Sequence, residues 1–207
     1  QGEKLRYNWN APIHQSPNDP GTIYLGSQFL FRTRDQGQTW DRISLDLSTQ
    51  DKARQQQELS GGITVDNSSA EMHTTIYSIS ESPRNRDVIW VGTDDGNVQV
   101  TRDGGKSWTN TAKNLKGLPA GAWTSWVEAS RHDEGTAFIT VDRHTYGDMD
   151  PHVFATRDFG KSWQRIAAAG QGVRGFAHVI KQDPVDARLL YLGTEFGLWI
   201  SIDGGAN

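Results

Sequence analysis

The sequence predicts an all-β protein built from repeated four-stranded units, and three observations lead to this prediction. A short motif of the form Thr/Ser-x-Asp-x-Gly-x-x-Trp recurs along the 207 residues. A similar series of short β-rich runs, separated by turn residues, accompanies each copy. No long amphipathic helical pattern interrupts these runs, and only Gln50–Leu59 has a helical composition. Internal repeats of this size indicate a repeat architecture.

The recurring motif predicts a hairpin turn in each unit. Its Asp can accept hydrogen bonds from turn N–H groups and from the hydroxyl two residues earlier. Its Gly permits a positive φ, and its Trp is expected to bury its ring against the sheet. We therefore expect a structural role for the motif positions. These are Thr33, Asp35, Gly37, Trp40, Thr101, Asp103, Gly105, Trp108, Thr156, Asp158, Gly160, Trp163, Ser201, Asp203 and Gly205.

The order of candidate strands divides the chain into four units. The strands precede and follow each motif, and the innermost strand of the first unit is expected at 9–13. They predict approximate blades at 1–44, 72–110, 123–167 and 173–207, with 45–71 as an inserted connection. Four-stranded units in series predict a β-propeller, and a solenoid of β-hairpins is the alternative. The fourth motif stops at Asn207, before its expected Trp. We therefore expect a partial propeller that further chain or a partner chain completes, because an open ring would expose a blade.

Composition argues against several classes of protein. The chain has 21 Lys+Arg against 25 Asp+Glu and no long basic run, which argues against nucleic-acid binding and against a polybasic membrane patch. No apolar stretch approaches the roughly 18 residues of a spanning helix. The absence of Cys excludes disulfides, thiolate nucleophiles and Cys-ligated zinc. No phosphate-binding glycine loop or Gly-x-Ser-x-Gly elbow occurs, so no cofactor is predicted.

The repeats also resemble a known family. The motif copies, together with Tyr7–Ile13, Gly92–Gly96 and Gly193–Gly197, resemble Asp-box (BNR-repeat) propellers of the sortilin-like kind and large secreted bacterial proteins labelled glycosyl hydrolases. The resemblance covers most of the chain. It implies a β-propeller and an extracytoplasmic location, periplasmic or secreted. Sialidases, xyloglucanases, sortilins and photosystem assembly factors share the Asp box, so the resemblance implies no single function.

The long loops predict which propeller face carries function. Successive loops of a blade alternate between the two faces, so the box turns share one face with the compact Pro-containing loops. The opposite face receives the long connections 44–75 and 110–123 and the expanded loop 142–151. Long loops in compact domains are usually functional or disordered. We therefore expect the binding or catalytic site on the face opposite the boxes.

Carboxylates in matching turns are the catalytic candidates. Asp94 and Asp95 occupy the turn Gly92–Gly96, and Glu195 takes the corresponding place in Gly193–Gly197. Such a pair of carboxylates could act as the general acid and base in glycoside hydrolysis. The alternative is that Asp-Asp-Gly is simply favourable turn chemistry.

An acidic, histidine-containing loop and two aromatic residues are the candidates for ligand binding. The loop contains two His and three Asp, but its spacing matches no calcium loop, so no metal site is predicted. The alternative is a solvated loop with an ion pair to Arg143. At spacing three, Trp123 and Trp126 are expected on opposite sides of a strand, one between blades and one at the channel mouth. The candidates are Trp123, Asp142, Arg143, His144, Tyr146, Asp148, Asp150, His152 and Phe196.

Two function classes follow from these features. The first is a non-catalytic recognition or scaffold propeller that binds a protein, peptide or glycan on the loop-rich face. The second is a glycoside hydrolase, xyloglucanase-like or sialidase-like, that uses paired carboxylates. A sialidase needs an arginine cluster and an Arg-Ile-Pro motif; only Arg143 and Arg174 are face-side arginines, and the motif is absent.

Overall fold

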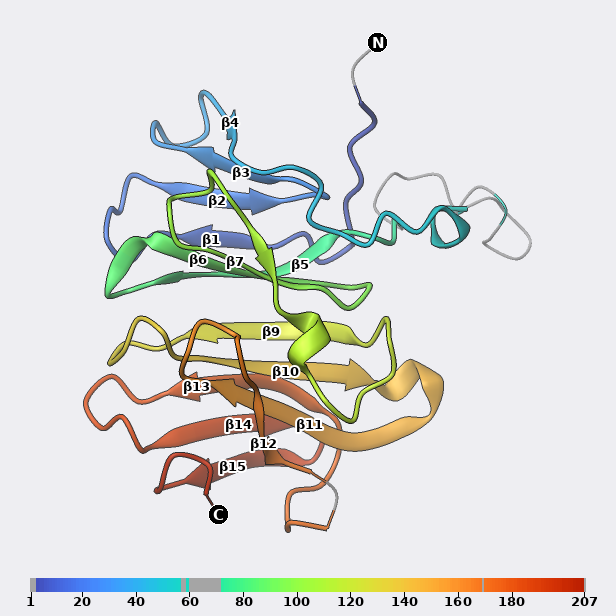
Figure 1. Cartoon of the computed structure of the whole chain (residues 1–207), viewed down its shortest axis with the longest axis vertical. Helices are drawn as coiled ribbons and strands as arrows, with labels where there is room; N and C mark the ends of the chain where they lie inside the picture. The colour runs from blue at the N-terminus through green and yellow to red at the C-terminus, as the bar shows by residue number, and fades with distance from the viewer. Residues whose placement is uncertain (1–2, 57–58, 60–71, 169, 207) are drawn as a thin grey trace.

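A computed structural model describes residues 3–56, 59, 72–168 and 170–206 and shows four antiparallel sheets stacked along the long axis (Figure 1). This arrangement confirms the predicted all-β class. In sheets A and B the strands follow one another in chain order. Sheet A contains β1 (Ile13–Gln15), β2 (Ile23–Gly26), β3 (Leu30–Thr33) and β4 (Asp41–Arg42). Sheet B contains β5 (Ile76–Ser82), β6 (Asn85–Thr93), β7 (Val98–Thr101) and β8 (Thr109–Asn110).

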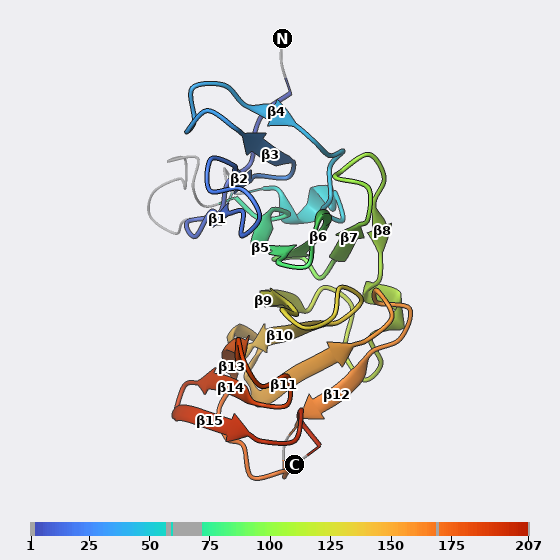
Figure 2. The ribbon, with the colours of Figure 1, turned by 90° about the vertical axis from the view of Figure 1, so that its left-hand side faces the viewer.

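The second half of the chain repeats this meander. Sheet C contains β9 (Trp123–Ala129), β10 (Ala137–Arg143), β11 (Asp148–Thr156) and β12 (Gln164–Ala167). Sheet D contains β13 (Ala177–Gln182), β14 (Leu190–Thr194) and β15 (Gly197–Ser201). The first strand of each sheet forms one edge, and β8 and β12 lie on the side away from β1 and β13 (Figure 2). The first strands of neighbouring sheets therefore line a common inner side.

Short 3-10 turns occupy parts of the connections between strands. They are η1 (Lys52–Arg54), η3 (Ala112–Asn114) and η4 (His144–Tyr146). The helical composition of Gln50–Leu59 yields η1 and a 3-10 assignment at Leu59, and about half of the predicted connection 45–71 lies outside the described residues. The innermost strand expected at 9–13 begins instead at Ile13. Residues 9 and 10 form a turn in which the Asn8 side chain accepts a hydrogen bond from the backbone N–H of Asn10.

Each sheet in the middle of the stack buries both faces. On β6, Ile89 and Val91 pack toward sheet A, while Val88 and Trp90 pack toward sheet C. This follows from strand geometry, because successive side chains point to opposite faces. A third cluster, which includes Ile180, joins sheets C and D. The core is therefore a series of layers between blades.

The Asp-box turns have the predicted hydrogen bonds. Asp103 accepts from the Thr101 hydroxyl at 2.8 Å, from the Ser107 N–H at 2.9 Å and from the Ser107 hydroxyl at 2.5 Å. The first and third copies repeat this set, centred on Asp35 and Asp158. Each box connects the third strand of a sheet to the fourth, so these bonds fix the corner of a blade.

These hydrogen bonds predict a pH dependence of stability. The Ser107 hydroxyl, followed by the Ser107 N–H and the Thr101 hydroxyl, lowers the pKa of Asp103 from 3.8 to about 2. A depressed folded-state pKa stabilises the protein above the unfolded value, and this contribution disappears as the pH falls through the folded value. We expect the free energy of unfolding to decrease between about pH 4 and about pH 2. Urea unfolding of the Asp103→Asn variant should show a smaller decrease, and an identical decrease would contradict this role.

The box Gly and Trp also contact the preceding blade. A Cβ on Gly105, where φ is +100°, would lie 2.6 Å from the carbonyl oxygen of Ile43 on sheet A. Trp108 packs against the cluster between sheets A and B, and its indole N–H donates to Gly105. Trp40 is 40% exposed because sheet A has no preceding blade to cover it.

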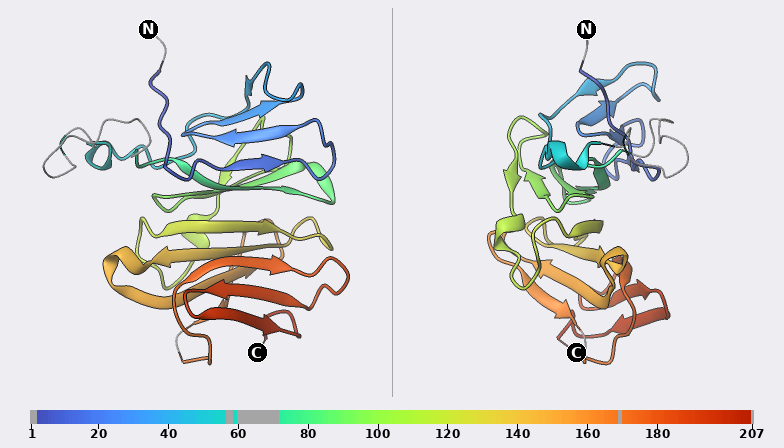
Figure 3. Two further views of the ribbon diagram at one scale, coloured as in Figure 1. Left: turned by 180° about the vertical axis from the view of Figure 1, so that it is seen from behind. Right: turned by 90° about the vertical axis from the view of Figure 1, so that its right-hand side faces the viewer.

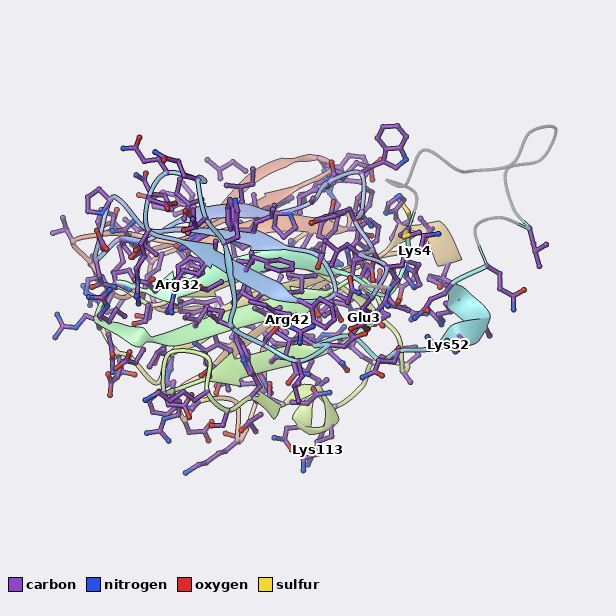
Figure 4. The ribbon with its side chains drawn as sticks, turned by 90° about the horizontal axis from the view of Figure 1, so that it is seen from above. Glu3, Lys4, Arg32, Arg42, Lys52 and Lys113 are labelled. Atoms are coloured by element: carbon purple, nitrogen blue, oxygen red, sulfur yellow. The ribbon has the colours of Figure 1, made fainter. Side chains whose placement is uncertain are left out.

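The N-terminal segment is fastened to the blade connections by Arg6. Its guanidinium lies 2.6 Å from Asp46 and donates to the Ser48 hydroxyl and to the carbonyl of Thr74. Seen from above, Glu3 lies beside Arg42, and their charged groups are 3.7 Å apart (Figure 4). The Arg6 pair is almost fully buried, whereas the Glu3–Arg42 pair is about half exposed.

Candidate functional site

One edge of the stack carries the long loops, and the Asp boxes lie at the other edge. The turn after β6, the β10–β11 loop with η4 and the turn after β14 all emerge where the innermost strands begin. From behind, η4 stands at the edge opposite the box turn that follows β15 (Figure 3). The predicted site residues therefore share one face, which we call the loop-rich face.

Asp94 and Asp95 are buried and fasten blade connections to sheet B. Asp94 accepts from the N–H and the hydroxyl of Thr75, at 2.8 and 2.7 Å. Asp95 accepts from the N–H and the hydroxyl of Thr49 and from the Thr93 hydroxyl. Only 3% of Asp94 and 2% of Asp95 is exposed. These contacts give both carboxylates a structural role, and their catalytic role stays a prediction.

A histidine reinforces the same turn. His73 Nδ1 lies 3.5 Å from Asp94 Oδ2, and its Nε2 lies 3.3 Å from the Arg54 guanidinium. The hydrogen bond with Asp94 raises the pKa of His73, while burial opposes the shift. The connection that carries η1 is thereby fastened to sheet B.

A cavity of about 500 Å³ follows the innermost strands of all four sheets. It occupies the position of a propeller's central channel, which the blades surround. Its polar and aromatic lining includes Tyr77, Trp123, Trp126, Glu128, Asp142 and Lys181. Two of the sequence candidates, Trp123 and Asp142, therefore lie together in the cavity wall.

Bulges in three innermost strands shape this cavity. Where the first strand of a sheet pairs with the second, one residue of the first strand has no partner. This residue is Tyr77 in β5, Ser125 in β9 and His178 in β13. All three residues line the cavity. Bulges re-aim side chains and are over-represented next to functional sites. Sequence reasoning missed this set, because an extra residue in a strand leaves no mark in the pattern of apolar residues.

The two tryptophans of β9 both line the cavity, but they contact different neighbours. The Trp123 ring meets Tyr77 of sheet B, whereas Trp126 packs against the cluster between sheets C and D and lies under Lys181. These contacts agree with the expectation of one tryptophan between blades and one at the channel. The indole Nε1 atoms of both tryptophans are buried and have no hydrogen-bond partner within the described part of the chain. Both indole N–H donors are therefore unsatisfied and shielded from solvent.

Asp142 lies at the loop-rich end of the cavity. It faces Trp123 across the β9–β10 ladder. Its Oδ1 accepts from the backbone N–H of His144 at 2.9 Å and lies 2.7 Å from His144 Nδ1. The His144 ring stacks on Phe176, with 4.4 Å between centroids. Asp142 thus joins the cavity to η4.

An ion pair crosses the cavity wall from sheet C to sheet D. Lys181 Nζ lies 2.7 Å from Glu128 Oε2 and 4.7 Å from the centre of the Trp126 ring. The two charges neutralise each other. His14, which also lines the cavity, has its pKa lowered mainly by burial.

Other charged residues of the acidic loop form ion pairs with one another outside the cavity. Asp148 lies 3.0 Å from Arg143 Nε and 2.9 Å from His152 Nε2, and His152 also contacts Arg165. Tyr146 and Asp150 are exposed. In the described residues, no group of three or more His, Asp or Glu side chains is arranged to hold a metal ion. The loop therefore separates into the Asp142–His144 pair at the cavity and a second group behind it.

Glu195 and Phe196 lie in the turn between β14 and β15. Both are exposed, and neither lines the cavity. The Phe196 ring lies close above Gly175, which has a φ of +80°. No structural observation pairs Glu195 with a second carboxylate among the described residues, so its catalytic role also stays a prediction.

The comparisons with known proteins support the fold. No family model matches the chain. An oligoxyloglucan-reducing end-specific xyloglucanase of Emericella nidulans is 25% identical over 158 residues, which cover 72% of this chain and 17% of that protein. The structure of an ancestral GH74 enzyme matches with a TM-score of 0.68 at 15% identity, over 100% of this chain and 25% of that one. The GH74 enzyme of Niastella koreensis matches with a TM-score of 0.64 at 15% identity, over 94% and 28%.

These matches confirm the Asp-box propeller structure. Because the chain spans about a quarter of the matched GH74 structures, its four sheets correspond to part of a larger assembly of blades. In the part of the chain that the structure describes, no helix has the length and apolar character needed to span a membrane.

Proposed function

We propose that the chain is part of a non-catalytic recognition propeller that binds a protein, peptide or glycan at the loop-rich end of its channel. The observation that carries this proposal is the cavity wall, where Tyr77, Trp123 and Trp126 are combined with the carboxylate of Asp142. Ligand pockets commonly combine aromatic walls with a few placed polar groups. The buried, fully hydrogen-bonded state of Asp94 and Asp95 further supports binding over catalysis.

Binding should depend on Trp123. We expect the labelled full chain to bind members of a peptide array or a glycan array, and Trp123→Ala to weaken that binding by roughly 2 kcal/mol or more, as for an aromatic hot spot. Trp40→Ala is the matched control, because Trp40 lies in a box turn on the opposite face. The proposal is wrong if neither array retains the chain, or if both variants bind like the unaltered protein.

The second candidate function is glycoside hydrolysis. It is favoured by the sequence similarity to a xyloglucanase and by the fold shared with GH74 enzymes. Release of reducing sugar from xyloglucan, lost in Glu195→Gln or Asp94→Asn variants that keep the unaltered melting temperature, would support it. Absence of release by the chain joined to its neighbouring blades would exclude it.

Ring completion and location belong to the same proposal. Ile13 on sheet A and Leu198 and Ile200 on sheet D are exposed apolar residues at the two ends of the stack. Equivalent layers between the other sheets are buried, so we propose that further blades or a partner chain cover these ends. An extracytoplasmic location remains proposed on the family resemblance.

A further inference from the structure

Two aromatic rings and a carboxylate form one corner of the channel cavity. The rings of Tyr77 and Trp123 meet at 81° with 4.5 Å between centroids. Asp142 lies opposite Trp123 in the β9–β10 ladder, and all three residues line the cavity. Two nearly perpendicular aromatic walls beside a carboxylate form a corner with one open side toward the cavity.

The corner carries a negative charge without a cationic partner from lysine or arginine. The Asp142 side chain is 8% exposed, and its Oδ1 is occupied by the contacts to His144. Its Oδ2 receives no hydrogen bond from the described residues. Lys181, the lysine of the cavity wall, is already paired with Glu128. The remaining basic groups nearby are imidazoles of His14, His144 and His178.

The field of the carboxylates extends to the phenol of Tyr77. Burial is the largest cause of the raised pKa of Tyr77, and the hydrogen bond from Asn10 opposes it. The negative charges of Asp142 and Asp94 raise the pKa further. The mouth of the channel is therefore electrostatically negative around the two rings.

We propose that this corner binds one basic side chain, a lysine ammonium or an arginine guanidinium, of an extended peptide. Aromatic faces attract cations, and a charge-assisted hydrogen bond to Asp142 Oδ2 would hold the cation at the open side of the corner, against the rings. The buried carboxylate also disfavours an anionic ligand at this point, because like charges repel in a low-dielectric wall. This inference rests on the proposed recognition function and specifies the chemistry of its ligand.

The test uses the full chain and a pair of peptides that differ in one charge. The probe is a Gly-Gly-Lys-Gly-Gly peptide, and its counterpart carries Nε-acetyl-lysine, which keeps the length but removes the charge. Binding is followed by the NMR signal of the Trp123 indole N–H, assigned with Trp123→Phe. We expect the lysine peptide to shift this signal and the acetylated peptide to leave it unchanged.

Protein variants provide the second arm of the test. We expect Asp142→Asn, which keeps the Oδ1 acceptor, to weaken binding of the lysine peptide roughly tenfold or more. Asp41→Asn, on the exposed strand β4, removes an equal charge and should bind unchanged. Equal binding of both peptides, no binding of the lysine peptide, or full affinity of Asp142→Asn would overturn the inference. Charge-independent binding at Trp123 would contradict this inference and leave the recognition function intact. Absence of binding on both the peptide array and the glycan array would contradict the inference and the recognition function together.

Discussion

Replacing Arg6 with Ala is expected to lower the free energy of unfolding by roughly 3–5 kcal/mol. The substitution leaves Asp46 buried without its charge partner, and it removes hydrogen bonds to Ser48 and Thr74. Removing one member of a buried pair costs far more than the net stability of the pair, because the remaining charge stays desolvated. Urea unfolding measures the loss.

An exposed arginine provides the matched control. Arg42 pairs with Glu3 at 3.7 Å with both side chains about half exposed, so Arg42→Ala should change stability by at most about 1 kcal/mol. The double variant Arg6→Ala/Asp46→Ala should recover part of the loss, because it also removes the stranded carboxylate. Equal stabilities of Arg6→Ala and Arg42→Ala would show that Arg6 does not fasten the N-terminal segment.

Trp90→Ala is expected to destabilise the protein by roughly 3–5 kcal/mol through the cavity it leaves. Trp90 is fully buried between sheets B and C, and its ring meets Trp163 of the third Asp box at 5.8 Å. The variant therefore opens the layer that holds two blades together. Thermal and urea unfolding, monitored by far-UV circular dichroism, measure the loss.

Replacing Trp90 with phenylalanine separates the effect of side-chain volume on stability from the effect of the indole N–H. Trp90→Phe keeps an aromatic ring and removes an indole N–H that has no hydrogen-bond partner among the described residues. Because the loss of volume is smaller and an unsatisfied donor disappears, this variant should be clearly more stable than Trp90→Ala. If the two variants unfold alike, packing at this layer does not control stability.

Local chemistry made the blades predictable. The box residues around Asp35, Asp103 and Asp158 bond within one turn, so their geometry depends on residues at most a few positions apart. The alternation on β6 likewise follows from strand geometry alone. The first innermost strand was misplaced, because residues 9 and 10 form a turn stabilised by the Asn8 side chain.

The candidate site was predicted only in part. The loop-rich face followed from loop lengths, and Trp123 and Asp142 were among the sequence candidates. Their meeting with Tyr77 depends on contacts between sheets, which the order of residues does not specify. Asp94 and Asp95 suit a turn in the sequence, but their burial results from Thr75 and Thr49, which belong to another connection.

By itself, the sequence determined the repeat, the Asp-box turns, the all-β class and the face that carries the long loops. Each of these depends on backbone conformation and side-chain bonds within a single blade. Tertiary structure decided which side chains enter the channel. One extra residue in β9 brings Ser125 into the cavity wall, and the stacking of sheets B and C brings Tyr77 to Trp123. The physical reason is that register and packing between blades depend on the partner strand, which no local pattern contains.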